Sequence, residues 1–533
     1  MDGAAAHVVT FGTVAAVEGA RARVVLDMAE DGSGFAGPVP PQIGQVVRID
    51  VGEARVFGII IGLRTPAAEQ AIIGPPNQIM DLDMIGEVLD SGADTRFRRG
   101  VSEFPRLGDR VSAAGSDDLR KIFMRTDREG VRVGCVHQDP SIPAHIFTDD
   151  LLGKHFAVLG TTGSGKSCAL AAIVRGILSQ HKHGHVLILD PHNEYGAAFG
   201  ELADVISPAN LELPYWLLNF DEMKELIIGE SSRTPEIDAS ILNYVIVEAK
   251  KKLAGAGTAE FAITVDTPVP YRLSDVTRII DDLMGKYERP LELAPYMRIK
   301  DRFNSLQADR RYAFMFPGLM VRDEMTRLLS RIFRVPVDGK PVTIFDTSGV
   351  PTEILNVVVS MLCRITFDFA LWSDRSVPIL LICEEAHRYA PSNEKMGFEP
   401  TKRAIARIAL EGRKYGVSLG LVTQRPSELA ANILSQCNTI FAMRITNNRD
   451  REYLAAAMPE SGSGMLEELP ALRAAEAIAI GEGVPVPLRI MFDPLPDDCR
   501  PHSNTAKFSA CWDQDNIPAE FLTEVVSRWR RQR

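Results

Sequence analysis

The chain has 533 residues, of which 45% are hydrophobic and 24% are charged, and its formal net charge at pH 7 is −11. This length suits about three domains of ~150 residues, and the composition is ordinary for a soluble globular protein. The acidic balance argues against a protein that coats nucleic acid with its outer surface. It argues less against a ring, whose channel needs only a small basic lining.

Membrane and secretion signals are also missing from the sequence. No window reaches the ~18 uninterrupted apolar residues of a membrane helix. Residues 1–12 lack a basic start followed by an apolar core, so we expect no secretion signal. The seven cysteines are scattered without a C-x-x-C pair, as is usual for free thiols in a reducing compartment. We therefore expect a cytoplasmic protein without a membrane segment.

Residues 1–135 are predicted to form an N-terminal β-barrel. Short apolar runs, such as Val24–Leu26, Val46–Ile49 and Val56–Ile61, are separated by breaks that contain Gly or Pro. Several short strands with turn signals favour a small barrel. The simplest interpretation of such a module is a structural platform that carries no chemistry.

From residue 136 the pattern changes to strands that alternate with helices. Phe156–Leu159 and His185–Asp190 are apolar runs typical of buried strands, and a Gly-rich turn and a helix follow the first. This alternation implies a mostly parallel sheet with helices on both faces. We assign residues 136–212 and 336–475 to the two parts of this α/β core.

Two further segments complete the predicted organisation. Residues 213–335 have apolar side chains at helical spacing, for example Val276 and Ile280, and are predicted to form a helical bundle inserted in the core. Residues 476–533 are predicted to form a C-terminal hairpin and then an amphipathic helix that begins near Pro518.

The strongest chemical signal is GTTGSGKS at residues 160–167, which matches the P-loop pattern G-x-x-x-x-G-K-[ST] in full. It follows an apolar strand and opens a helix, so backbone amides and the helix N-terminus can cradle phosphates. Lys166 would reach the β- and γ-phosphates of ATP, and Ser167 would ligate Mg²⁺. The predicted nucleotide-binding residues are Gly160, Thr161, Thr162, Gly163, Ser164, Gly165, Lys166, Ser167 and Cys168.

A P-loop needs an acidic partner on a neighbouring strand. Ile379–Cys383 is an apolar run that ends in two carboxylates, Glu384 and Glu385. We expect Glu384 to hold the metal ion together with Ser167, and Glu385 to polarise the attacking water.

Polar residues near other strand ends are further candidates. Gln424 follows the strand Ser418–Val422 and would sense the γ-phosphate and the water, unless it only caps the loop. Arg413 is favoured as an arginine finger that reaches the nucleotide of a neighbouring subunit. Arg444 competes for that role, and a solvated surface arginine is the alternative for each.

The second core strand ends in the run DPHNEY at residues 190–195. We expect His192 to shape the loop beside the phosphates rather than to act in catalysis. Glu194 is a candidate acid just outside the metal ligands.

These motifs together resemble the HerA family. The resemblance is carried by GTTGSGKS, LILDPHNEY, LLICEEAHRYAP, EGRKYGVSLGLVTQRPSEL and ILSQCNTIFAMRITNNRDREYL. It covers about residues 1–500 and is specific to the clade that HerA shares with FtsK-like translocases. Within that clade the barrel favours HerA, and the chain resembles a bacterial HerA-like protein. Glu384 stands where many P-loop enzymes have Asp, which keeps the acid pair but changes the metal geometry.

The resemblance implies a RecA-like core in a homohexameric ring that uses ATP and Mg²⁺ to move double-stranded DNA through its channel. It also implies nucleotides between subunits, with Arg413 acting across the interface, and a C-terminal arm that braces the next subunit. HerA-like proteins typically work with a nuclease, and archaeal members process DNA ends. Many bacterial members are paired with a nuclease or a sirtuin-type NAD-consuming effector in anti-phage defence.

DNA contacts are expected from loops that face the channel, with little base specificity because such motors contact phosphates. The candidates are Lys395, Lys402 and Arg403 after the acid pair, and Arg310 and Arg311 in the helical insertion. A solvated basic surface is the alternative for both groups.

Two other functions stay open at this point. One is a ring scaffold whose ATPase assembles and regulates a partner effector without processive DNA movement. The other is a pump for protein or conjugative substrates, which would predict a membrane segment.

Overall fold

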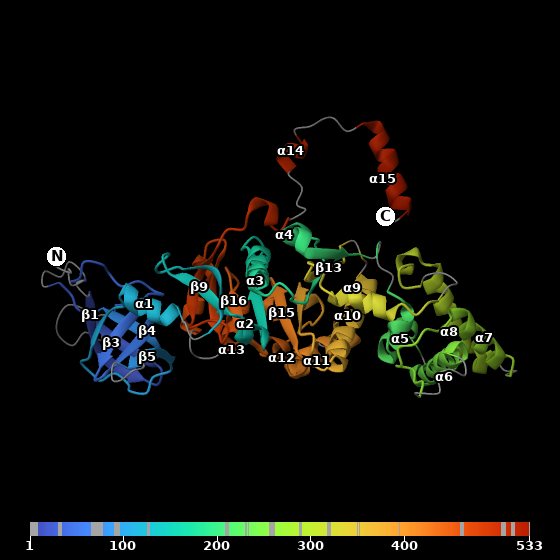
Figure 1. Ribbon diagram of the computed structural model, residues 1–533, viewed down its shortest axis with the longest axis horizontal. Helices are drawn as coiled ribbons and strands as arrows, with labels where there is room; N and C mark the ends of the chain where they lie inside the picture. The colour runs from blue at the N-terminus through green and yellow to red at the C-terminus, as the bar shows by residue number, and fades with distance from the viewer. Residues whose placement is uncertain are drawn as a thin grey trace.

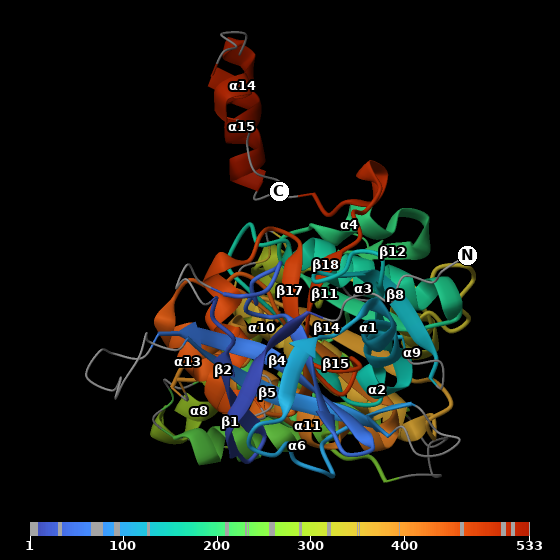
Figure 2. The ribbon, with the colours of Figure 1, turned by 90° about the vertical axis from the view of Figure 1, so that its left-hand side faces the viewer.

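The computed structural model describes residues 9–29, 35–65, 78–89, 96–124, 128–207, 210, 213–229, 232, 234–254, 262–286, 290–316, 321–348, 350, 352–393, 395–458, 463–502, 508–512 and 518–531. Figure 1 shows the β-barrel at one end of the molecule, the α/β core in the middle and the helical insertion at the other end. The last two helices project away from this body in both ribbon views (Figures 1 and 2).

The N-terminal sheet closes into a barrel, as the alternating apolar runs predicted. Its strand order is β2-β1-β7-β3-β4-β5-β6, and a further pairing of β2 with β5 closes the barrel, with β6 outside it. Side chains such as Phe11, Val24 and Ile49 are buried inside, and the barrel strands lie in front of the core in Figure 2. The elements are β1 (Thr10–Glu18), β2 (Arg21–Leu26), β3 (Val46–Val51), β4 (Ala54–Arg64), β5 (Ile79–Leu89), β6 (Phe97–Arg99), β7 (Arg110–Ala113) and the following helix α1 (Ser116–Phe123).

In the described residues, the core is built on an eleven-stranded sheet with the order β12-β13-β11-β14-β15-β10-β16-β17-β18-β8-β9. The strands from β12 to β16 are parallel, and those from β16 to β9 pair antiparallel. The strands are β8 (Gly130–Val136), β9 (Pro143–Phe147), β10 (His155–Leu159), β11 (Val186–Asp190), β12 (Ala203–Ile206), β13 (Val342–Asp346), β14 (Ile379–Glu384), β15 (Val417–Thr423), β16 (Cys437–Ala442), β17 (Glu476–Gly481) and β18 (Leu488–Phe492).

Helices cover the sheet, which confirms the predicted α/β class. β10, β11, β14 and β15 are buried along their whole length, as expected for strands covered on both faces. The core helices are α2 (Thr148–Leu152), α3 (Lys166–Gln180), α4 (Tyr195–Phe199), α10 (Thr352–Trp372), α11 (Glu399–Tyr415), α12 (Ala431–Leu434) and α13 (Asn448–Ala457). The described residues also form the short 3₁₀ helices η2 (Gly200–Leu202), η3 (Tyr215–Leu217), η5 (Arg310–Tyr312), η6 (Ala386–Arg388), η7 (Pro426–Glu428), η8 (Ser463–Ala471) and η9 (Asp497–Cys499).

Two segment boundaries differ from those expected. Residue 135 lies within β8, which pairs with β18 in the core sheet, so the barrel strands end earlier, at Ala113. The hairpin expected from residue 476 is β17 and β18, and it also belongs to the core sheet because β17 pairs with β16. Local periodicity predicts that a strand exists but not which sheet it joins.

The inserted segment is helical, as predicted. It consists of α5 (Phe220–Ile227), α6 (Pro235–Ala254), α7 (Leu273–Met284), α8 (Pro290–Ala308) and α9 (Met325–Phe333). The predicted residues Val276 and Ile280 are both fully buried in it.

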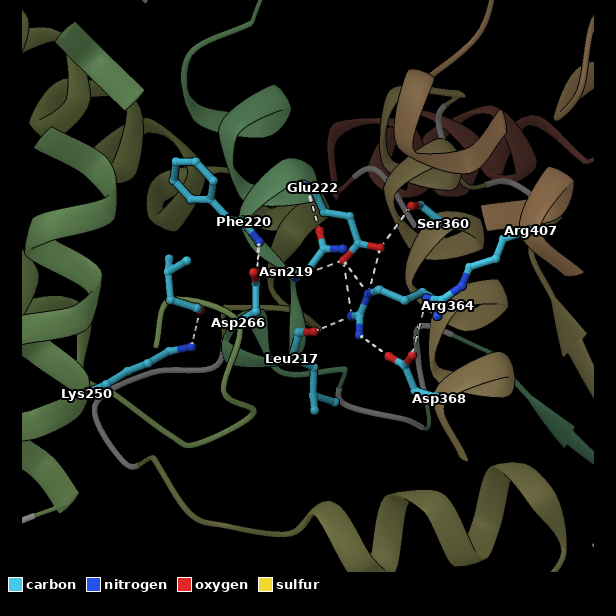
Figure 3. Close-up of polar contacts among 11 residues, drawn as sticks. Leu217, Asn219, Phe220, Glu222, Lys250, Asp266, Ser360, Arg364, Asp368 and Arg407 are labelled. Atoms are coloured by element: carbon cyan, nitrogen blue, oxygen red, sulfur yellow. Dashed lines mark hydrogen bonds and ion pairs between the residues drawn. The ribbon is translucent and has the colours of Figure 1, made fainter. Parts of the chain in front are cut away.

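A buried ion pair joins this insertion to the core (Figure 3). Glu222 of α5 and Arg364 of α10 lie 3.1 Å apart, and the Glu222 side chain is only 1% exposed. Arg364 also donates to the carbonyl of Leu217 and to Asp368. Asn219 caps α5 in a reciprocal arrangement with Glu222, so one carboxylate serves both the helix start and the inter-domain contact.

Helix α10 has the length and composition of a membrane span over Ile354–Trp372, and 72% of this window is buried inside the protein. It packs against α11, α5 and the strands β14 and β15. Its apolar character is therefore accounted for by its position in the core.

The C-terminal arm consists of α14 (Phe508–Trp512) and α15 (Ala519–Arg531). α15 begins one residue after the start predicted from the amphipathic pattern. Trp512, Leu522 and Trp529 are 79%, 66% and 80% exposed. The arm thus carries large apolar side chains that the body of this chain does not cover.

Candidate nucleotide-binding site

The P-loop lies between β10 and α3 with its backbone preformed. Gly163 and Gly165 have φ values of 76° and 99°, a region that favours glycine. A Cβ on Gly160 would lie 2.7 Å from the hydroxyl of the buried Ser164. Lys166 donates to the carbonyl of Thr161 at 3.3 Å. The loop therefore presents its amides and the N-terminus of α3 as an anion cradle.

The predicted site residues meet at one edge of the sheet. β10 pairs with β15, β15 with β14, and β14 with β11, all parallel. The carboxyl ends of parallel strands share an edge, which is where ligands bind in open α/β sheets. The segments that follow these four strands are the P-loop, Gln424, the acid pair and the turn of residues 190–195.

That turn is organised by the buried carboxylate of Asp190. It accepts from the backbone amides of His192 at 3.2 Å and Tyr195 at 3.0 Å. Asn193 is left-handed, with a φ of 52°. The exposed ring of His192 lies 3.5 Å from Glu385. His192 thus belongs to this turn through its backbone amide, and its ring faces the acid pair.

The turn brings the two predicted metal ligands together. The Ser167 hydroxyl donates to Glu194 at 2.6 Å, and the Tyr195 hydroxyl donates to Glu384 at 2.7 Å. Because residues 194 and 195 are adjacent, Ser167 and Glu384 lie on the same side of the sheet edge. The sequence did not single out Tyr195, since an aromatic residue after a buried strand reads like any core side chain.

The charges at this edge are unbalanced. Glu384 is 3% exposed, and burial raises its pKa to about 8, although the Tyr195 hydroxyl and Lys166 oppose the shift. Burial lowers the pKa of Lys166, against the pull of Glu384, Glu385 and Glu194. Three carboxylates thus surround one ammonium group, an arrangement that suits an additional cation.

The donor set fits a metal ion that arrives with a nucleotide. Within the described residues, no group of three or more His, Cys, Asp or Glu side chains is arranged to hold a metal by itself. Mg²⁺ is usually held by one or two carboxylates together with substrate phosphates and water. Ser167 and Glu384, steadied by Glu194 and Tyr195, are the residues that would hold it.

Glu385 points to different partners from those of Glu384. Its backbone is left-handed, with a φ of 53°. Its Oε1 accepts from the amide of Gln424 at 3.0 Å, and the Gln424 oxygen accepts from Thr162 of the P-loop. Its buried Oε2 lies 3.3 Å from His387 but accepts no hydrogen bond from the described residues. One carboxylate oxygen is therefore fixed by Gln424, and the other is buried beside His387 without a hydrogen-bond donor among the described residues.

The two candidate arginines occupy opposite edges of the sheet. The carbonyl of Arg444 accepts from the backbone and hydroxyl of Thr161, so Arg444 borders its own P-loop. Arg413 lies at the other end of β15, which has seven residues, or roughly 20 Å at ~3.3 Å per residue. It is exposed, and its guanidinium forms no hydrogen bond or ion pair with the described residues. Arg413 cannot reach the nucleotide of its own subunit.

The candidate DNA contacts lie outside this site. Lys402 and Arg403 pair with Glu399, and Arg311 pairs with Asp309, so acids partly neutralise these three. Lys395 and Arg310 are exposed.

Comparison with known proteins shows which proteins this chain is similar to. A family model described as "Helicase HerA, central domain" matches residues 131–366. The DNA double-strand break repair helicase HerA of Pyrococcus furiosus is 28% identical over 406 residues, which cover 72% of each chain. A probable DNA double-strand break repair helicase HerA of Methanocaldococcus jannaschii is 26% identical over 419 residues, covering 72% of this chain and 80% of the relative.

Solved structures with a similar chain course include VirB4 of Thermoanaerobacter pseudethanolicus, at a TM-score of 0.48 and 15% identity, covering 70% of this chain and 98% of that one. The plasmid coupling protein TrwB in complex with ADP and Mg²⁺ has a TM-score of 0.47 and 14% identity, covering 74% and 94%. Over residues 131–366, which include the P-loop, the chain is similar to the central domain of HerA helicases.

Proposed function

We propose that this chain is an ATP-driven motor that assembles as a homohexameric ring in the cytoplasm and moves double-stranded DNA through its channel. The observation that carries this proposal is the meeting of Ser167 and Glu384 through the adjacent residues Glu194 and Tyr195. It supports a complete ATPase site, and the relatives named as DNA double-strand break repair helicases support DNA as the substrate.

In this proposal the hydrolysis step follows from the positions of the side chains. The P-loop amides and Lys166 hold the triphosphate, and Ser167 and Glu384 hold Mg²⁺, which when bound neutralises charge on the phosphates. Glu385 polarises the attacking water. Gln424 forms hydrogen bonds with both Thr162 and Glu385. A γ-phosphate that binds at the P-loop can therefore change the position of Glu385 through Gln424.

The position of Arg413 supports a ring. An arginine finger stabilises the charge that develops on the γ-phosphoryl group, and Arg413 can do so only at the nucleotide of a neighbouring subunit. Arg413 would thus complete the site across each interface. The uncovered apolar side chains of α15 support a role for the C-terminal arm in bracing that neighbour.

A partner effector is part of the proposal. The resemblance to HerA supports a nuclease or a sirtuin-type NAD-consuming enzyme, acting in DNA-end processing or anti-phage defence. The barrel, which carries none of the predicted site residues, is the part of the chain free to serve as a platform.

ATP hydrolysis with and without linear duplex DNA tests the motor. We expect duplex DNA to raise the rate, and this effect to weaken as salt rises because phosphate contacts are salt-sensitive. Lys166→Ala should abolish hydrolysis in all conditions. If duplex DNA does not change the rate of ATP hydrolysis even when the partner is present, the alternative of a scaffold that assembles an effector is favoured.

A further inference from the structure

The turn of residues 190–195 presents two neighbouring side chains to the two metal ligands. Glu194 accepts from Ser167, and Tyr195 donates to Glu384. We infer that Tyr195 is a positioning residue whose hydroxyl aims the Glu384 carboxylate at the metal ion of the bound nucleotide. This inference rests on the proposed ATPase site and adds a residue to it.

The contact is strong because of where it lies. Tyr195 is fully buried and Glu384 is 3% exposed, and the 2.7 Å hydrogen bond joins a phenol to a carboxylate. Water does not compete with the bond at this depth.

The position of the hydroxyl is fixed by the turn. The backbone amide of Tyr195 donates to Asp190 at 3.0 Å, and Asp190 is itself fully buried at the end of β11. The ring packs on Phe199 with a centroid distance of 6.4 Å. The end of β11 therefore fixes the position of the Tyr195 hydroxyl, and this hydroxyl fixes the position of one carboxyl oxygen of Glu384.

The consequence concerns how Glu384 can bind a cation. Its Oε2 is engaged by Tyr195, so its Oε1 is the oxygen left for the metal ion or for a water molecule in the metal's shell. Glu194 holds Ser167 in a parallel manner. Groups that orient metal ligands typically change metal affinity by about 10- to 100-fold when they are removed.

Tyr195→Phe tests the inference because it removes only the hydroxyl. The binding of a fluorescent, non-hydrolysable ATP analogue is measured in EDTA and across a Mg²⁺ titration. We expect binding in EDTA to stay within about twofold, and the Mg²⁺ concentration that gives half of the Mg²⁺-dependent change in affinity to rise about 10- to 100-fold.

Tyr389→Phe is the matched control. Tyr389 is 1% exposed, and its hydroxyl has no hydrogen-bond partner among the described residues. Its removal should leave the Mg²⁺ requirement unchanged. The inference is overturned if Tyr195→Phe keeps the wild-type Mg²⁺ requirement, if both variants shift it equally, or if Tyr195→Phe weakens binding in EDTA to the same degree.

The experiment also separates this inference from the proposed function. It needs neither DNA nor turnover. If the chain binds Mg²⁺-nucleotide but does not respond to DNA, the proposed motor function fails while the inference about Tyr195 can still hold. A wild-type chain that does not bind the analogue at all would overturn both.

Discussion

Two adjacent acids, Glu384 and Glu385, have separate partners in this site. The left-handed backbone at Glu385 turns its side chain toward Gln424, while Glu384 stays with Tyr195. A non-glycine residue in this conformation costs about 1–3 kcal/mol and clusters at active sites. The two acids therefore have separate surroundings, and the division of roles, with Glu384 at the metal and Glu385 at the water, stays a prediction.

Glu385→Gln should keep ATP binding and lose turnover. The glutamine amide keeps the shape of the side chain and its contact with Gln424, but it is a far weaker base. The loss of a positioned base costs about 10²- to 10⁴-fold in rate. Single-turnover hydrolysis and equilibrium binding of ATP measure the two effects separately. Wild-type turnover would mean that another group activates the water.

Arg413→Ala should abolish hydrolysis in the ring while each subunit still binds ATP, with a loss of about 10³- to 10⁵-fold. Mixing Arg413→Ala subunits with Lys166→Ala subunits gives the sharper result. Some mixed interfaces then join an intact P-loop to an intact Arg413, so activity should partly return. Mixtures that stay inactive would contradict a finger that acts across the interface. Arg444 borders the P-loop of its own subunit. Mixing Arg444→Ala subunits with Lys166→Ala subunits should therefore not restore ATP hydrolysis.

At the level of elements, the sequence predicted the buried strands and the polar runs at their ends better than the sheet that each strand joins. The P-loop and the acid pair were predictable because each combines a buried strand with a specific polar run at its end. The link from Tyr195 to Glu384 joins residues 189 positions apart, and no local pattern encodes it. The same holds for β8, whose partner β18 lies far along the chain.

The contact between α5 and α10 should be a weak point of the fold when only one partner is removed. Arg364→Met leaves the Glu222 carboxylate buried and unpaired, which costs about 3–5 kcal/mol. Adding Glu222→Gln removes that charge and keeps the cap of α5, so the double variant should recover part of the loss. Hydrogen exchange in α5 measures this. Equal protection in wild type and Arg364→Met would show that the pair does not hold the insertion.

Lys250 of α6 should make the stability of the insertion depend on pH. Figure 3 shows Lys250 near the α5–α10 contact. Its ammonium group is buried and donates to the carbonyls of Val265 and Thr267. Burial lowers its pKa from 10.5 to about 8. Between pH 8 and 10.5 the unfolded chain binds more protons than the folded one, so the free energy of unfolding rises with pH across this window.

The matched measurement compares wild type with Lys250→Met. The difference in free energy of unfolding between the two should change in favour of wild type from pH 8 to pH 10.5 and stay constant below pH 8. A difference that is flat across this window would mean that the lysine keeps its ordinary pKa in the folded chain.

At the scale of the whole molecule, a net charge of −11 must be reconciled with a DNA substrate. Acids in the same chain pair with several of the candidate basic residues, among them Lys402 and Arg403. Exposed candidates such as Lys395 and Arg310 are better placed to meet phosphates. A net negative charge suits a ring that holds DNA inside a channel with a small basic lining better than a protein that binds DNA on its outside.

Movement along duplex DNA is the central claim, and displacement of a third strand measures it most directly. A triplex-forming oligonucleotide is bound at a distance from the end of a linear duplex, and its release is followed over time. Wild-type rings with ATP should release it, with a delay that grows with that distance, and Lys166→Ala rings should not. ATP hydrolysis without any release, with the partner effector present, would contradict the account.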